Sequence, residues 1–126
     1  MNQITLLFAS CYGAMAIIFG AFGAHALKKV LNEELLKSFE TGVKYQMYHA
    51  VLLVLLSFQL NFTTKLDSYI IYSFIIGIFL FSFSIYGLVL SSAKGKKIKL
   101  LGPITPLGGL FLVLGWFLLI YKATTI

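Results

Sequence analysis

The sequence contains no arginine, only one cysteine and only four acidic residues in a chain of 126 residues. Charged residues make up 11% of the chain, which is less than half of the roughly 25% found in soluble domains. The outer surface of the protein must therefore face something apolar. The lone Cys11 excludes a disulfide within the chain, and it excludes a thiol oxidoreductase, which needs paired cysteines.

The absence of arginine also bears on the basic character of the chain. The formal net charge is +6, and ten lysines carry all of the positive charge. Arginine is the usual reader of bases and phosphates in nucleic acids. The lysines here lie in short gaps beside apolar runs, where an anionic lipid surface attracts each of them by about 1 kcal/mol. We therefore expect membrane lipids as partners and no nucleic acid.

Four apolar runs without a charged residue fill most of the chain: Ile4–Leu27, Tyr45–Phe62, Tyr69–Leu90 and Ile104–Tyr121. A hydrocarbon core about 30 Å thick needs about 20 apolar residues per helix. The runs are apolar on all faces, whereas strands of a transmembrane barrel alternate in polarity. The sequence predicts an all-α integral membrane four-helix bundle. We expect one transmembrane domain, residues 1–126, with spans at about 4–27, 45–62, 69–90 and 104–121.

The lysines gather in alternate gaps between these runs. Eight of them lie in the first and third gaps, whereas only Lys65 and Lys122 lie in the second gap and near the C-terminus. Short lysine-rich loops stay in the cytoplasm. Four spans of the cell membrane then place both termini outside, with loops 28–44 and 93–103 cytoplasmic.

The first gap contains an amphipathic segment. Asn32 is a good helix N-cap, and Glu33 and Glu34 follow it where the helix dipole favours acidic side chains. Apolar residues then recur on one face. We expect a short amphipathic helix at the membrane interface between the first two spans. The alternative is that this segment runs straight into the second span, with Gly42 as a bend.

The fourth run begins with an unusual segment. Thr105 can cap a helix whose first residue is Pro106, because proline is favoured at that position. The helix would then be short, and residues 102–105 would enter the membrane as non-helical backbone. Such backbone needs partners from the bundle or from a wet cavity.

Small residues share one face of the first run, where Ala16, Gly20 and Ala24 recur at four-residue spacing. Small side chains allow helix backbones to approach closely inside a membrane. We expect this face to pack within the chain, with Gly108 and Gly109 of the fourth run as counterparts. The alternative is a seam between copies of the chain, which would form a homo-oligomer.

Polar residues collect toward the lysine-rich side of the chain. His25 closes the first run and His49 lies one turn inside the second, so antiparallel spans would bring them to one end. Polar groups at such depth usually face the bundle interior. One hypothesis is a pocket for an anionic lipid headgroup or small anion, with the N-terminus of the fourth helix pointing inward. It would consist of His25, Tyr45, His49, Thr105, Lys96, Lys97 and Lys99.

The alternative is that the histidines only hydrogen-bond neighbouring helices and that Tyr45 is an interfacial aromatic residue. Two histidines without acidic or cysteine partners are too few for zinc, so we expect no metal and no cofactor. A second functional class is a small transporter or channel component, with His49 as a proton carrier. We expect no enzyme activity, because the sequence shows no nucleophile with an activating base.

Three stretches together resemble a known family: Gly20-Ala-Phe-Gly-Ala-His25, Phe39-Glu-Thr-Gly-Val-Lys-Tyr-Gln-Met-Tyr-His49-Ala50, and Thr105-Pro-Leu-Gly-Gly109 leading to Gly115-Trp116. The chain resembles domain-of-unknown-function family 423, a group of small bacterial membrane proteins also classed as an uncharacterised UPF family. The likeness covers nearly the whole chain. It implies a four-span integral membrane protein, and it brings no enzymatic activity.

Overall fold

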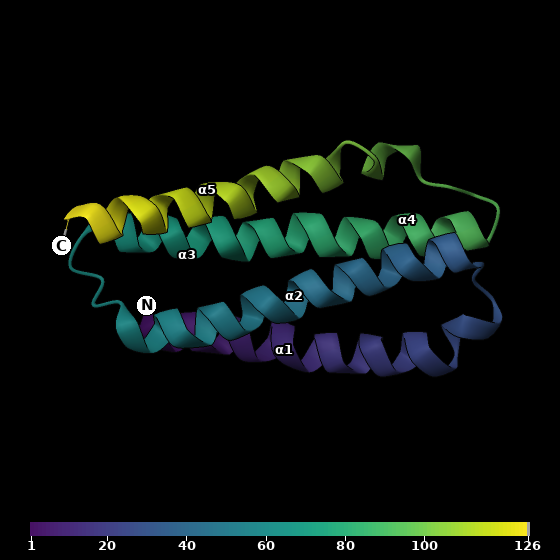
Figure 1. The fold of residues 1–126 in the computed structure, drawn as a ribbon, viewed down its shortest axis with the longest axis horizontal. Coiled ribbons are helices and arrows are strands. Elements are labelled where there is room, and N and C mark those ends of the chain that lie inside the picture. Colours follow the sequence, from purple (N-terminus) through teal and green to yellow (C-terminus); the bar gives the residue numbers. More distant parts are fainter. Residues whose placement is uncertain (126) are drawn as a thin grey trace.

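The computed structural model describes residues 1–125, which fold into four helical rods without any strand (Figure 1). The long helices are α1 (Asn2–His25), α2 (Glu33–Gln59), α3 (Lys65–Ile78), α4 (Ser84–Ala93) and α5 (Ile104–Thr125). The short helices are η1 (Leu27–Lys29), η2 (Phe79–Phe83) and η3 (Lys99–Leu101). Because η2 is a π-helical turn inside one continuous helix, α3, η2 and α4 form a single rod. The predicted all-α bundle of four helices is confirmed.

The rods are arranged as two antiparallel pairs. α1 packs along α2, and α5 packs along α3 and η2, while α2 joins the pairs through its contacts with η2 and α4. Figure 1 shows both chain ends at one end of the bundle, together with the connection between α2 and α3. The connections 26–32 and 94–103 lie at the other end, which is called the lysine-rich end below; the end with the termini is the opposite end.

The amphipathic segment of the first gap is the beginning of α2. Asn32 caps this helix as predicted, because its side-chain oxygen accepts a 2.8 Å hydrogen bond from the Leu35 N–H. The helix then continues without interruption to Gln59, so no separate interfacial helix exists and the predicted loop 28–44 is reduced to residues 26–32. Packing explains the continuity. Ser82 donates a 2.7 Å hydrogen bond to the Gly42 carbonyl, and Phe39 is buried against α1 and Tyr86.

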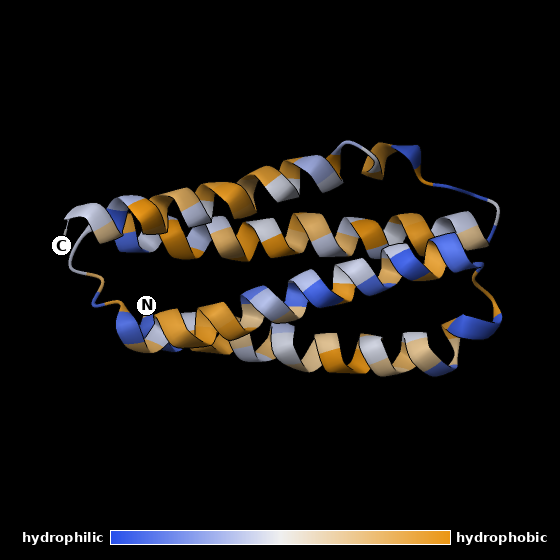
Figure 2. Cartoon of the chain, in the orientation of Figure 1, coloured by the Kyte–Doolittle hydropathy of each residue, from blue (hydrophilic) through white to orange (hydrophobic). Residues whose placement is uncertain are grey.

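Three of the rods are long and apolar enough to cross a membrane: Asn2–Lys29, Lys65–Ala93 and Lys99–Thr125. Charged residues fill the first turns of α2 (Figure 2), and its apolar part from Tyr45 to Gln59 covers only about 22 Å. α2 nevertheless lies along the whole of α1: Asn2 bonds the Leu60 carbonyl at one end, and Gly23 lies against Phe39 near the other. α2 therefore occupies the same depth as a helix that can span.

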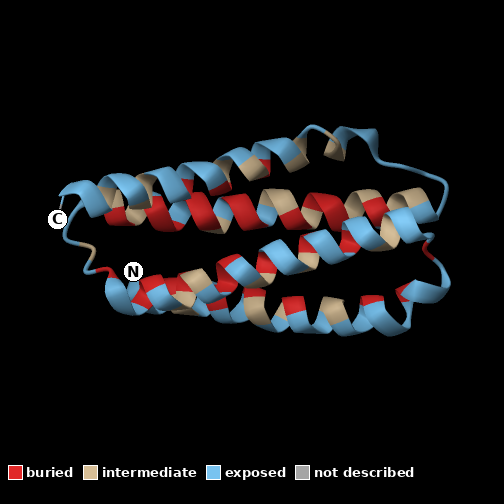
Figure 3. Ribbon diagram, viewed as in Figure 1, coloured by how far each residue is buried: buried red, intermediate tan, exposed pale blue. Residues whose placement is uncertain are grey.

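The buried core is unevenly shared between the rods. Figure 3 shows many buried residues on α3, whereas α5 is mostly exposed. On α3, Ile70, Ile71 and Phe74 are fully buried, since neighbouring helices pack against them. On α5, only Gly108, Leu112 and Gly115 are buried. α5 therefore presents a broad apolar surface on the outside of the bundle.

Two of the three small residues of α1 that were expected to pack within the chain, Ala16 and Gly20, do so. Ala16 is 1% exposed, and Gly20 faces Val43 of α2 at ordinary packing distance. Gly23 fits closely against the ring of Phe39, where a Cβ atom would lie 2.9 Å from the ring. Ala24, in contrast, remains exposed.

The glycines of α5 have a different partner from the predicted one. Gly108 rests on the backbone of η2, and a Cβ atom there would overlap the Phe81 nitrogen. Gly109 lies beside the Phe81 ring with room for a methyl group. These glycines therefore do not pack on the small face of α1, because α5 packs on the rod of α3 and η2 while α1 packs on α2.

α5 begins at Ile104 and not at Pro106, so Thr105 lies in the first turn and is not the cap. Its hydroxyl oxygen is 2.5 Å from Ser84 Oγ, and the Leu107 N–H donates to the Pro103 carbonyl at 3.4 Å. These two contacts extend the helix backward by two residues. Pro106 is tolerated because the N–H groups of a first helical turn have no partner within the helix.

Candidate functional site

The structure separates the residues of the predicted pocket. His25 ends α1 as an exposed residue at the lysine-rich end, whereas His49 is 6% exposed in the middle of α2. The α1 residue level with Ala50, the neighbour of His49, is Gly13. His25 lies twelve residues beyond Gly13, which is about 18 Å along the helix. The histidines do not meet, because α2 begins at Glu33 and His49 therefore lies about four turns along the helix from the lysine-rich end.

His49 is hydrogen-bonded through both ring nitrogens. Trp116 Nε1 donates to His49 Nε2 at 3.1 Å, and His49 Nδ1 lies 2.8 Å from the Tyr45 carbonyl oxygen. An indole N–H can only donate, so Nε2 accepts and Nδ1 carries the hydrogen that bonds Tyr45. The imidazole is therefore neutral and joins α2 to α5. Trp116 was not predicted as its partner; the signal was an indole in an apolar run, since such a group needs an acceptor.

A cleft of about 440 Å³ opens at the lysine-rich end between α2, α4 and the start of α5. Its apolar lining is Leu35, Ile85, Leu88 and Val89. Its polar lining is Glu34, Ser38, Ser92, Lys97 and Thr105. Two members of the predicted pocket, Lys97 and Thr105, therefore share this cleft. Lys96 and Lys99 lie in the same connection as exposed residues that do not line it.

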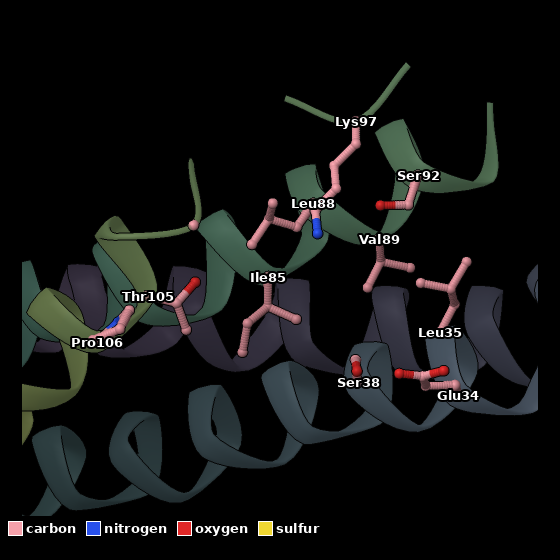
Figure 4. Close-up of a pocket in the computed structure, with 11 residues that line it drawn as sticks. Glu34, Leu35, Ser38, Ile85, Leu88, Val89, Ser92, Lys97, Thr105 and Pro106 are labelled. Atoms are coloured by element: carbon pink, nitrogen blue, oxygen red, sulfur yellow. The ribbon is translucent and has the colours of Figure 1, made fainter. Parts of the chain in front are cut away.

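Opposite charges line this cleft without pairing. Figure 4 shows Lys97 reaching inward from the connection after α4, and Glu34 on α2 at the other side of the cleft. The apolar side chains of α4 lie between them. In the described part of the chain, the only ion pair joins Lys122 to Asp67. Lys97 and Glu34 therefore do not neutralise each other, and both are available to a ligand.

The first turn of α5 borders the same cleft through Thr105 and Pro106. The Thr105 hydroxyl is already bonded to Ser84, so it is not a free ligand group. The N-terminal end of a helix carries a partial positive charge that favours anions. The electrostatic environment near Lys97 is therefore positive, and it becomes negative toward Glu34.

An apolar groove of about 330 Å³ lies between α2 and α5, next to the cleft. Its lining residues are Tyr45, His49, Phe81, Pro106, Gly109, Leu110, Leu112, Val113 and Trp116. Pro106 borders both the cleft and the groove. On α2 and on the rod of η2 and α4, the groove residues lie one or more turns from the cleft residues in the direction of the opposite end. On α5 the two hollows meet at Pro106, and the remaining groove residues follow it along the helix. The two hollows thus follow one another along the same side of the bundle.

The interior of the bundle holds a closed polar network. Gln46 is 0% exposed, donates to the Tyr12 carbonyl at 2.7 Å and accepts from the Tyr86 hydroxyl at 2.7 Å. The Tyr12 hydroxyl donates to the Ile75 carbonyl at 2.9 Å. Over residues 1–125, Asp67 Oδ1 is the only buried polar side-chain atom without a hydrogen bond. The network therefore offers no free polar group to a passing ion.

Comparisons with known proteins agree with the sequence resemblance. The model of the family DUF423, which is described as a protein of unknown function, matches residues 19–109. A UPF0382 membrane protein of Staphylococcus aureus is 34% identical, over 94% of this chain and 93% of its own length. A UPF0382 membrane protein of Bacillus subtilis is 32% identical over 96% of both chains. One from Schizosaccharomyces pombe is 35% identical, over 86% of this chain and 91% of its own length. No solved structure matches the chain.

Proposed function

The chain belongs to the DUF423 family of membrane proteins, and from that premise we propose that it is a non-enzymatic lipid-binding protein of the cell membrane. The cleft at the lysine-rich end binds a phosphate-bearing lipid headgroup or a small anion. The observation that carries the proposal is the inward Lys97 side chain, which has no carboxylate partner within residues 1–125 and lies over an apolar floor.

Three features support an anionic group near Lys97. The first turn of α5 directs its partial positive charge toward the cleft. Lys96 and Lys99 in the same connection raise the local positive potential without entering the cleft. A site of this volume is also within the range of ordinary small-molecule sites, about 300–1,000 Å³. This site keeps Lys97 and Thr105 of the predicted pocket and leaves out His25, Tyr45 and His49.

The proposal also includes an orientation, with the lysine-rich end in the cytoplasm and both termini outside. The test is cysteine labelling in intact cells, in a Cys11→Ser background. Lys97→Cys should react with a membrane-impermeant maleimide only after permeabilisation, whereas Lys65→Cys at the opposite end should react in intact cells. Labelling of Lys97→Cys in intact cells would overturn the orientation.

Lipid binding is tested by native mass spectrometry of the full chain purified in detergent. Lys97→Ala should lower the apparent affinity for phospholipid about tenfold, since a hydrogen bond to a charged group contributes about 1.5–3 kcal/mol. The matched control is Lys96→Ala, which removes the same charge from the same connection but outside the cleft. Equal lipid binding by both variants and the wild type would disprove the headgroup site.

A small transporter or channel component is the weaker proposal. His49 has both nitrogens in hydrogen bonds, and the network around Gln46 is closed. A proton or ion would have to break these bonds to pass. Flux in liposomes under an imposed pH gradient would nevertheless favour this alternative.

A further inference from the structure

The two charges of the cleft restrict its ligand more than either charge alone. A simple anion would pair with Lys97 but would also meet the Glu34 carboxylate, which repels it. A simple cation would pair with the Glu34 carboxylate but would be repelled by Lys97. A ligand that carries a phosphate and an ammonium group a few bonds apart satisfies both side chains at once. The cleft therefore matches a zwitterionic headgroup better than a purely anionic one.

The lining also distinguishes between kinds of ammonium group. Quaternary ammonium groups, which have no N–H donors, are recognised by cages of aromatic rings. None of the described residues that line the cleft is aromatic, whereas Glu34, Ser38 and Ser92 supply oxygen acceptors. Oxygen acceptors suit a primary ammonium group, which donates three hydrogen bonds. The preferred headgroup is therefore of the ethanolamine type and not of the choline type.

The groove between α2 and α5 continues the cleft and has the chemistry of an acyl-chain site. It shares Pro106 with the cleft and reaches Trp116, ten residues further along α5, which is about 15 Å. Its walls are almost entirely apolar and aromatic, and the one histidine in it has both nitrogens satisfied. Gly109 keeps the groove wide because no side chain projects there. An acyl chain attached to a headgroup in the cleft would pass Pro106, the residue shared by both hollows, to enter this groove.

We propose that the cleft and the groove together bind one phospholipid whose headgroup carries a phosphate and a primary ammonium group. Lys97 pairs with the phosphate, Glu34 pairs with the ammonium group, and one acyl chain lies between α2 and α5. This inference rests on the proposed headgroup site and adds the identity of the lipid and the position of its chain.

The headgroup is tested with an equimolar mixture of phosphatidylethanolamine, phosphatidylglycerol and phosphatidylcholine that have the same acyl chains. Native mass spectrometry of the wild-type protein should show the phosphatidylethanolamine adduct at least fivefold above the other two. Glu34→Gln should bring the ratio of phosphatidylethanolamine to phosphatidylglycerol to within twofold. The matched control is Glu33→Gln, the neighbouring acidic residue outside the cleft, which should keep the wild-type ratio.

The acyl-chain site is tested by filling the groove. Val113→Trp should lower the affinity for phosphatidylethanolamine and phosphatidylglycerol about tenfold, because the added ring occupies the groove. Leu114→Trp is the matched control, since Leu114 has nearly the same exposure, 45% against 46%, but does not line the groove. Glycerophosphoethanolamine, which has the headgroup without chains, should compete poorly for the intact lipid. Equal effects of the two tryptophan variants, or full competition by the chain-free headgroup, would remove the groove from the proposal.

Different results would contradict the headgroup site and the choice of an ethanolamine-type headgroup. If Lys97→Ala leaves every adduct unchanged, the headgroup site itself is wrong. If Lys97→Ala weakens all adducts but Glu34→Gln leaves the lipid ratio unchanged, the site stands and the choice of an ethanolamine-type headgroup is wrong.

Discussion

The two ends of the bundle differ in whether their charged side chains are paired. At the opposite end, Asp67 is 1% exposed, and its Oδ1 lies 2.7 Å from Lys122 Nζ. At the lysine-rich end, Lys97 and Glu34 line an open cleft without pairing. A buried carboxylate is costly unless it is paired, whereas charges beside an open cleft can remain with water or a ligand. The comparison indicates that the paired charges at the opposite end hold the fold together, whereas the charges at the lysine-rich end have no such role.

The backbone around Asp67 supports this division. Its Oδ2 accepts a 3.0 Å hydrogen bond from the Phe62 N–H, and Phe62 has a φ of +54° in the left-handed region. A non-glycine residue there costs about 1–2 kcal/mol. The contact with Lys122 is an ion pair and not an aligned hydrogen bond, because Oδ1 has no hydrogen-bond partner. One carboxylate thus holds the turn between α2 and α3 and the end of α5 together.

The largest expected effect concerns how α5 is held near the cleft. Gly108→Ala should destabilise the protein by about 2–3 kcal/mol, because the new methyl group overlaps the backbone of η2, which cannot move aside easily. The measurement is thermal unfolding in detergent. Gly109→Ala is the matched control and should stay within about 0.5 kcal/mol, since a Cβ atom there lies 3.7 Å from the Phe81 ring. Equal losses in the two variants would contradict the close approach at Gly108.

The comparison of the two ends is tested directly with two isosteric substitutions. Asp67→Asn should cost about 2 kcal/mol of unfolding free energy, because Lys122 loses its charged partner and the turn loses a charge-assisted bond. Glu34→Gln should cost at most about 0.5 kcal/mol, since this exposed side chain has no ion-pair partner among residues 1–125 and loses only its interaction with the dipole of α2. Denaturation in a series of detergent mixtures measures both. If Glu34→Gln destabilises as much as Asp67→Asn, the division between a structural end and a binding end is wrong.

The smallest expected difference lies in the helix caps of the two ends. Asn32→Ala should cost about 1 kcal/mol, because its side chain caps α2 through the Leu35 N–H. Thr64 occupies the corresponding position before α3 but forms no side-chain cap bond, so Thr64→Ala should be close to neutral. The unfolding temperatures of the two variants, measured under the same conditions, test this difference in cap strength. The reverse order would show that the cap of α2 does not contribute to stability.

Much of the fold was predictable because the order of apolar and polar residues along the chain determines where the helices lie. The four apolar runs lie in the four rods, and Asn32 caps α2 as its side chain predicts. α5 starts two residues before the predicted Pro106, because Thr105 bonds Ser84, which lies far away in the sequence. The segment before Tyr45 has two interpretations in the sequence, because its charges suggest an interface, whereas in the structure its contacts with η2 and α4 extend the helix.

The candidate site was predictable only in part. Lys97 and Thr105 share a cleft, as the clustering of polar residues suggested. His49 and Tyr45 lie instead in the groove, and His25 lies in neither hollow. Glu34 was predicted as a residue of a helix start, and its place across from Lys97 depends on a contact between elements far apart in sequence.

The sequence by itself determined the apolar surroundings of the protein, the four helices and the unequal charge of the two ends. These properties follow from the order of apolar and charged residues along the chain, independently of packing. Only the tertiary structure decided which charges are paired, which glycines hold α5, and where the histidines lie. Those properties depend on the register between helices. Two features set that register: α2 starts at Glu33, and Gly108 packs directly against the backbone of η2. Both depend on contacts between residues that are far apart in the sequence.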